Sequence, residues 1–256
     1  MSSAEDLLRE AEVLIAEATK RGVILRVLGG VAIRYHCPSA GTPPLARHIA
    51  DIDLFGLSKQ STAIRKVFAG LSYDQAETFN ALHGNRRLMF FAPNTHARRD
   101  VFLDFFEMCH RFDFRSRLQI EDFSISLSDL LMTKLQVIDI EQRDYKDIVC
   151  MLMDHELGDS DAQDALNKNY IADVCSNDWG VYRSFTQNLE KTAGYLEQID
   201  LKGLQSKSVR ERIGVLGEAI ERAPKSARWK LRSLVGARMS WYEEPEVPKT
   251  IKFAEG

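Results

Sequence analysis

The stretch "RHIADIDLFGL", residues 47–57, places two aspartates inside an otherwise apolar run. The apolar residues around them predict a buried β-strand over residues 49–57. Side chains two positions apart on a strand share a face, so we expect Asp51 and Asp53 to lie side by side. Two adjacent carboxylates repel each other, and a divalent cation such as Mg²⁺ or Mn²⁺ removes that penalty. The pair therefore predicts half of a metal site, with a solvated edge face as the alternative.

Two glycines stand between a short β-branched segment and a short helical pattern upstream of these aspartates. The expected strand covers residues 23–28, the glycines are Gly29 and Gly30, and the expected helix covers residues 31–36. Glycine lets a backbone approach a phosphate closely, and the first N–H groups of a helix point at the anion. A tight turn is the alternative. The order strand, glycine pair, helix and Asp-x-Asp strand favours phosphate binding.

A later strand offers two candidates for a third carboxylate. Residues 86–93 and 98–106 read as a hairpin, and Asp100 and Asp104 are expected on one face of its second strand. Three carboxylates around one or two metal ions suit in-line phosphoryl or nucleotidyl transfer. Asp100 lies closer to the turn, so we prefer it slightly, and Asp104 stays open.

Two other groups of polar residues favour plainer interpretations. The basic residues of the hairpin are expected to form a solvated face, with guidance of a nucleotide or RNA as the alternative; they are Arg86, Arg87, Arg98 and Arg99. Cys109 and His110 have no neighbours in the sequence that complete a zinc set, so we expect them to serve packing. The four cysteines form no Cys-x-x-Cys pair and are expected to be reduced thiols.

The distribution of elements predicts an α+β fold with two domains. Residues 1–157 mix strands and helices, which indicates a small mixed or antiparallel sheet with flanking helices. Residues 162–256 are expected to form a helical domain, with four amphipathic helices between residues 161 and 244. The helices expected in the first domain outside the glycine motif span 4–21, 59–70, 126–142 and 144–156, with Ser128 as N-cap of the third.

Composition excludes some broad classes of partner. The 256 residues carry a formal net charge of −3, which gives no global attraction to nucleic acid or to an anionic membrane. We therefore expect no DNA partner and no membrane partner. The first residues lack the pattern of a signal peptide, and no apolar run is long enough to span a bilayer. A cytoplasmic location is the expectation.

The segments "VLGGVAIRYH", "RHIADIDLF" and "RDVFLDFF" together resemble the nucleotidyltransferase superfamily with the DNA polymerase β type of fold. The closest resemblance is to the AbiEii/AbiGii-toxin-like nucleotidyltransferases of prokaryotes, and it covers roughly residues 23–155. Those enzymes also carry a helical lysine and aspartate after the core. Here "DLLMTKLQVIDIEQRDYKDI", residues 129–148, supplies Lys134 and either Asp144 or Asp147.

The resemblance implies a role for each matching residue. The implied metal ligands are Asp51, Asp53 and Asp100. The implied nucleotide-binding residues are Gly29, Gly30, Arg47, Lys134 and Asp147. The implied catalytic set is Asp51, Asp53, Asp100, Asp104 and Lys134, in which the third acid helps to deprotonate an acceptor hydroxyl and the lysine neutralises phosphate charge. Val31 departs from the family pattern, which commonly has Ser or Thr after the glycine pair.

The implied activity is Mg²⁺-dependent transfer of a nucleoside monophosphate from an NTP to a hydroxyl of RNA, protein or a small molecule. A toxin with an antitoxin protein as partner is one biological setting. Val31 motivates an alternative, a non-catalytic nucleotide-binding or interaction module on the same fold. A glycosyltransferase ranks lowest, because only about 50 residues precede the Asp-x-Asp pair and such enzymes usually carry a longer doubly wound domain there.

Overall fold

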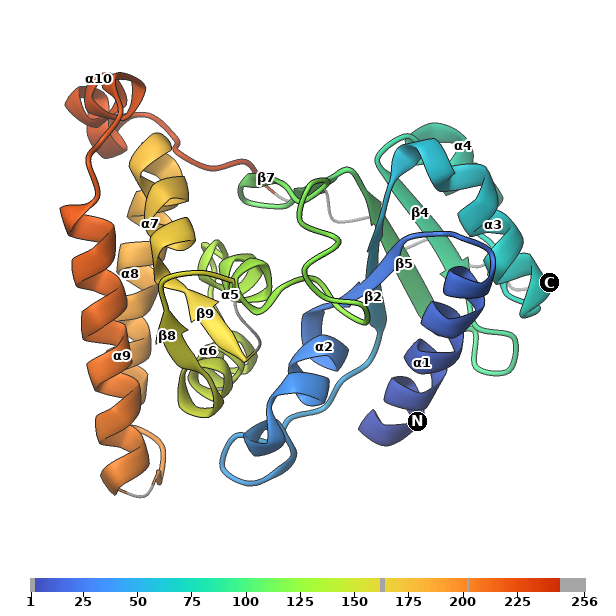
Figure 1. The fold of residues 1–256 in the computed structure, drawn as a ribbon, viewed down its shortest axis with the longest axis horizontal. Coiled ribbons are helices and arrows are strands. Elements are labelled where there is room, and N and C mark those ends of the chain that lie inside the picture. Colours follow the sequence, from blue (N-terminus) through green and yellow to red (C-terminus); the bar gives the residue numbers. More distant parts are fainter. Residues whose placement is uncertain (1–2, 162–163, 202, 245–256) are drawn as a thin grey trace.

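A five-stranded mixed sheet lies at the centre of one lobe of the computed structural model, which describes residues 3–161, 164–201 and 203–244 (Figure 1). In spatial order the strands are β1 (Leu25–Leu28), β2 (Ile52–Gly56), β5 (Arg98–Leu103), β4 (Arg87–Phe91) and β3 (Asp74–Gln75). Strand β2 runs parallel to β5, and the other neighbours are antiparallel. The predicted mixed sheet is confirmed, and so is the predicted hairpin, which is β4 and β5.

One face of this sheet packs on helices α1 (Ala4–Lys20) and α3 (Ser61–Gly70). Phe90 of β4 stacks on Phe68 of α3 with ring centroids 3.8 Å apart. Arg99 is fully buried beside it and donates to both carboxylate oxygens of Glu10 in α1, at 2.7 and 2.6 Å. The prediction that Arg99 belongs to a solvated face is wrong, because Glu10 supplies the buried counter-charge that makes its burial tolerable.

The opposite face carries Asp53 and Asp100 and is closed by a second, smaller hairpin. This hairpin consists of β6 (Phe105–Glu107) and β7 (Arg111–Asp113). Phe102 of β5 packs on Phe106 with ring centroids 4.9 Å apart. The predicted strand over residues 98–106 is therefore two strands, and they are separated at Asp104, whose φ is +62°.

The second lobe is helical. Its helices are α5 (Leu127–Leu135), α6 (Gln142–Asp154), α7 (Lys168–Asn177), α8 (Trp179–Tyr195), α9 (Gly203–Arg222) and α10 (Ala227–Val235). The shorter elements of the chain are α2 (Gly29–His36), η1 (Pro38–Gly41), η2 (Ser58–Gln60), α4 (Glu77–His83), β8 (Glu156–Gly158), β9 (Ala165–Asn167) and η3 (Gly236–Arg238). Among the residues that the structure describes, none of these helices has both the length and the apolar character needed to cross a membrane.

Two predicted helices differ most from the observed ones. The helix expected over residues 126–142 ends at Leu135, and its N-cap is Ser126, whose hydroxyl accepts from the backbone N–H of Asp129. Ser128 is instead buried inside that helix, where its hydroxyl accepts from the backbone N–H of Asn167 at 2.8 Å. The helix expected from residue 161 begins at Lys168, after β9.

Helix α6 joins the two lobes. Its residues 147–152 are all buried, because α6 contacts α2 and η1 on one side and α8 and α9 on the other. The predicted domain boundary at 157–162 begins inside β8, which pairs in parallel with β9. Figure 1 shows α5 and α6 grouped with the C-terminal helices rather than with the sheet. Residues 245–256 of the predicted helical domain lie outside the described residues.

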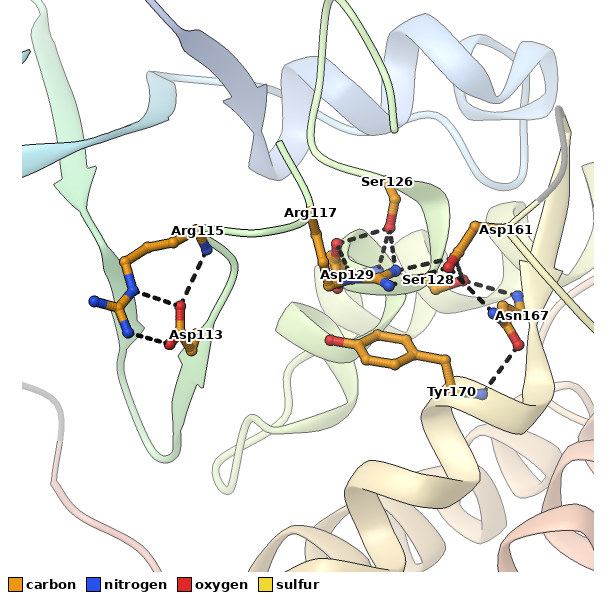
Figure 2. Close-up of polar contacts among 9 residues, drawn as sticks. All are labelled: Asp113, Arg115, Arg117, Ser126, Ser128, Asp129, Asp161, Asn167 and Tyr170. Carbon is orange, nitrogen blue, oxygen red and sulfur yellow. Dashed lines mark hydrogen bonds and ion pairs between the residues drawn. The ribbon is translucent and has the colours of Figure 1, made fainter. Parts of the chain in front are cut away.

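A buried polar network holds the segment between the lobes in place (Figure 2). The guanidinium of Arg117 donates to Asp129 of α5 at 2.8 and 2.9 Å, and to Asp161 at 2.9 and 3.0 Å. It also donates to Ser126 at 3.0 Å and lies 3.6 Å from the ring centroid of Tyr170 in α7. One side chain therefore connects the chain leaving the sheet with three segments of the helical lobe.

We expect Arg117→Met to lower the free energy of unfolding by about 3–5 kcal/mol, because it leaves the buried Asp129 carboxylate without its partner. The matched control is Arg115→Met. Arg115 forms an exposed pair with Asp113 (Figure 2) and should matter far less. Urea unfolding followed by circular dichroism measures both variants. Equal losses in the two variants would show that the network does not hold the lobes.

Candidate functional site

The pairing of three strands brings the predicted acids together at one end of the sheet. Asp53 lies opposite Leu28 of β1 on one side and opposite Asp100 of β5 on the other. Asp51 immediately precedes β2. It therefore lies one residue outside the observed strand, although we expected the strand to include it. Burial, together with the charges of Asp51 and Asp100, raises the pKa of Asp53 to about 7. The three carboxylates therefore interact at this end of the sheet.

Two features of the backbone at position 29 require a glycine. Its φ of +70° is strained for any other residue, and a Cβ there would lie 2.8 Å from a carboxylate oxygen of Asp53. The pair Gly29–Gly30 follows β1 directly and opens helix α2, which starts two residues before the predicted helix. The predicted order strand, glycine pair, helix and acid-bearing strand is therefore present in space, with the glycine turn against Asp53.

Arg47 lies against the second glycine. A Cβ on Gly30 would be 2.7 Å from a terminal nitrogen of the Arg47 guanidinium. The same guanidinium donates twice to the carboxylate of Asp147 in α6, at 2.7 Å for each bond. Lys134 of α5 approaches Asp147 at 2.8 Å and Asp144 at 3.5 Å. Both candidates that the sequence left open, Asp144 and Asp147, thus face the predicted lysine.

The charges of this cluster hold one another in the ionised state. Burial by itself raises the pKa of the Asp147 carboxyl, but Lys134 and Arg47 outweigh it and keep that pKa below its ordinary value. Burial lowers the pKa of Lys134, and the charges of Asp147 and Asp144 outweigh it, so the pKa of Lys134 is raised. Two cations therefore lie beside the glycine turn at neutral pH.

Asp100 is fully buried and has two arginine neighbours. Arg87 Nε donates to Asp100 Oδ1 at 3.0 Å, and Arg98 Nε lies 2.7 Å from Oδ2. The second approach lacks the alignment of a hydrogen bond, so Oδ2 is a buried carboxylate oxygen that accepts no hydrogen bond from the described part of the chain. We expected Arg87 and Arg98 on a solvated face, but both guanidinium groups are directed at this buried carboxylate instead. For Arg98, strand alternation is a sequence signal for this contact, because Arg98 lies two residues before Asp100 and so shares its face of β5.

The side chain of Asp104 is engaged in hydrogen bonds with a neighbouring segment of the chain. It follows the end of β5 and accepts from the backbone N–H of Ser58 at 2.9 Å and from the Ser58 hydroxyl at 2.5 Å. Asp100 and Asp104 therefore do not share a strand face, contrary to the prediction, because the positive φ of Asp104 turns the chain into β6. The register of β2 with β5 favours Asp100 as the third acid.

The fit of a metal ion depends on the two remaining carboxylates. Neither the Asp51 nor the Asp53 side chain makes a hydrogen bond or an ion pair within residues 3–161, 164–201 and 203–244. Within the same residues, no set of three His, Cys, Asp or Glu side chains is arranged to hold a metal ion. Mg²⁺ is commonly bound by one or two carboxylates, with substrate phosphates and waters as its other ligands. The pair fits an ion of that kind.

The Cys109–His110 pair serves packing in the structure. The ring nitrogen Nε2 of His110 lies 2.8 Å from the Ser184 hydroxyl, and burial lowers the pKa of His110 to about 4. All four cysteines are buried free thiols. Comparisons of the chain with protein-family models, curated proteins and solved structures give no match.

We expect Asp53→Asn to stabilise the metal-free protein at pH 8 but not at pH 4. Folding raises the pKa of Asp53 from 3.8 to about 7. Between these values the folded state holds a proton that the unfolded state has released, so stability falls as pH rises and stays low above pH 7. Asparagine does not titrate, so the variant should gain roughly 2–4 kcal/mol at pH 8 relative to pH 4.

Thermal or urea unfolding in EDTA at both pH values measures this difference. The control is Asp74→Asn, an exposed isosteric change in β3, which should behave alike at pH 4 and pH 8. Adding Mg²⁺ should stabilise the wild type at pH 8 and the Asp53 variant much less. An Asp53 variant whose stability difference from wild type is the same at both pH values would contradict the raised pKa.

Proposed function

We propose that the chain is a metal-dependent nucleotidyltransferase that transfers a nucleoside monophosphate from an NTP to a hydroxyl group. The observation that carries the proposal is the pair Asp51 and Asp53, two carboxylates that have no hydrogen-bond or ion-pair partner among the described residues and lie beside a third acid and a glycine turn. The arrangement of β1, α2, β2 and β5 around them supports a core of the DNA polymerase β type. The acceptor remains open among RNA, protein and small molecules.

In this proposal Asp51 and Asp53 hold the Mg²⁺ ion that arrives with the NTP. When bound, the ion neutralises phosphate charge and activates the attacking oxygen. The acceptor hydroxyl attacks the α-phosphorus, a new P–O bond forms, the bond from the α-phosphorus to the bridging oxygen breaks, and pyrophosphate leaves. The hydroxyl proton passes to Asp100, whose register beside Asp53 supports this role.

The phosphates would lie against the start of α2. The backbone N–H groups at Gly29 and Gly30 and the side chain of Lys134 are the proposed contacts. Val31, where the family commonly has a hydroxyl, is buried in the core with 1% of its surface exposed. Arg47, packed on Gly30, supplies a guanidinium close to the same turn. We infer that this arginine takes over the phosphate contact that a hydroxyl provides in the family.

A non-catalytic nucleotide-binding module is the second candidate. The observation that favours it is the pairing of Asp100 with Arg87 and Arg98, which places a cation at each oxygen of the carboxylate that would otherwise face an acceptor hydroxyl. A toxin with an antitoxin protein partner stays a prediction for the biological setting. Both candidates share the nucleotide site and differ in turnover.

We expect wild-type protein to transfer label from an α-labelled NTP in the presence of Mg²⁺ to one fraction of total RNA, protein extract or small molecules. The Asp51→Asn, Asp53→Asn double variant should transfer none, and Asp74→Asn should match wild type. The labelled fraction identifies the acceptor class. Metal-dependent NTP binding without transfer would favour the binding module, and the absence of both would contradict the proposal.

The third acid can be assigned by comparing Asp100→Asn with Asp104→Asn. We expect Asp100→Asn to retain NTP binding and to lose transfer by about 10²–10⁴-fold, because it removes a proton acceptor. Asp104→Asn weakens only its contacts to Ser58, so it should lower the unfolding temperature and leave transfer per folded molecule unchanged. Single-turnover transfer and melting curves measure both. The reverse pattern would assign the role to Asp104.

A further inference from the structure

A cavity lies between the helical lobe and the β6–β7 hairpin, apart from the acidic site. Its volume is about 680 Å³, within the range of small-molecule sites. Its walls come from the tip of the β6–β7 hairpin, the start of α8, helix α10 and the segment Ser240–Glu243, which we name the strap. In Figure 1 the chain leaves α10 and runs back toward β7, and the strap is part of this return.

All three tryptophans of the chain line this cavity, although they are far apart in the sequence. The rings of Trp179 and Trp241 meet edge to face with centroids 6.3 Å apart. The indole N–H of Trp241 donates to the Ser184 hydroxyl at 3.2 Å. The indole nitrogen of Trp229 is buried and has no hydrogen-bond partner among the residues that the structure describes, which is uncommon for a buried donor. The cavity is therefore lined by three aromatic side chains from separate segments.

The charged residues that line the cavity differ in the hydrogen bonds and ion pairs that they make. Asp178 is the N-cap of α8 and accepts hydrogen bonds from the N–H groups of Gly180 and Val181. Arg232 donates to three backbone carbonyls, and its guanidinium lies 4.8 Å from the Trp179 ring centroid. Arg228 is exposed and has no hydrogen-bond or ion-pair partner in the part of the chain that the structure describes. An uncommitted cation therefore stands beside aromatic walls.

Backbone contacts fix the shape of the cavity. The N–H of Glu243 in the strap donates to the carbonyl of Cys109 at the hairpin tip, at 3.0 Å. A Cβ on Gly180 would collide with the backbone oxygen of Trp241, so the strap lies directly on the first turn of α8. Binding here needs little ordering of the walls, which lowers its entropic cost.

We propose that this cavity is a second nucleotide site, which takes one unpaired nucleotide with its base against the tryptophans and its phosphate on Arg228. Aromatic faces beside a cation are how proteins hold unpaired nucleotides, since every base has a π-face and each phosphate carries a negative charge. The nucleotide is either a free mononucleotide or one residue of a single-stranded RNA. The site stands independently of the proposed transfer reaction.

Intrinsic tryptophan fluorescence of the full chain reports on this cavity, because every tryptophan lines it. We expect saturable quenching when the protein in EDTA is titrated with AMP or with the hexanucleotides of adenylate and uridylate. Arg228→Ala should weaken binding about tenfold by removing the phosphate contact. The matched control is Lys230→Ala, which removes the same charge from the same exposed helix but not from the cavity lining.

The Asp51→Asn, Asp53→Asn variant should quench like wild type, which separates this site from the acidic one. Quenching by AMP as strong as by the hexanucleotides identifies a free nucleotide as ligand, and quenching by the hexanucleotides alone identifies an RNA strand. Absence of saturable quenching by all probes overturns the proposal. Equal weakening by the Arg228 and Lys230 changes, or equal competition by inorganic phosphate alone, also overturns it.

Discussion

The parallel pairing of β2 with β5 brings Asp53 directly opposite Asp100, at the end of the sheet where Asp51 also lies. Three carboxylates so close together repel one another, and the fold must offset that repulsion. Part of the offset is a proton, since the pKa of Asp53 rises to about 7. Cations offset the rest of the repulsion. Arg87 and Arg98 pair with Asp100, and the positive charge of Lys134 partly counteracts the rise in the pKa of Asp53.

The positions of these cations explain why the two lobes belong together. Lys134 and Asp147 come from helices α5 and α6 of the helical lobe, whereas the glycine turn and Asp53 come from the sheet. Arg47, in the loop before β2, bridges them by donating to Asp147 while resting on Gly30. The site is therefore assembled where the lobes meet, and α6 is buried on both sides because it forms that junction.

The acidic site and the tryptophan cavity share a structural neighbour. This neighbour is the C-terminal end of α5 and the loop that follows it, directly after Lys134. The side chain of Asn188 in α8 donates there to the backbone carbonyls of Leu135 and Val137. The Gln136 side chain in turn accepts from the backbone N–H of His110, at the rim of the cavity, at 2.7 Å. The residues that position the lysine thus also position one wall of the proposed second site.

The sequence by itself determined the local features of this protein: the glycine pair between strand and helix, the Asp-x-Asp segment, the β4–β5 hairpin, and a lysine and an aspartate on successive helices. Each follows from the conformation of a few neighbouring residues. Only the tertiary structure decided that Asp100 rather than Asp104 lies beside Asp53, that Arg99 is buried on Glu10, and that three distant tryptophans share one cavity. Those outcomes depend on strand register and on contacts between segments far apart in the chain, which no local pattern of residue types encodes.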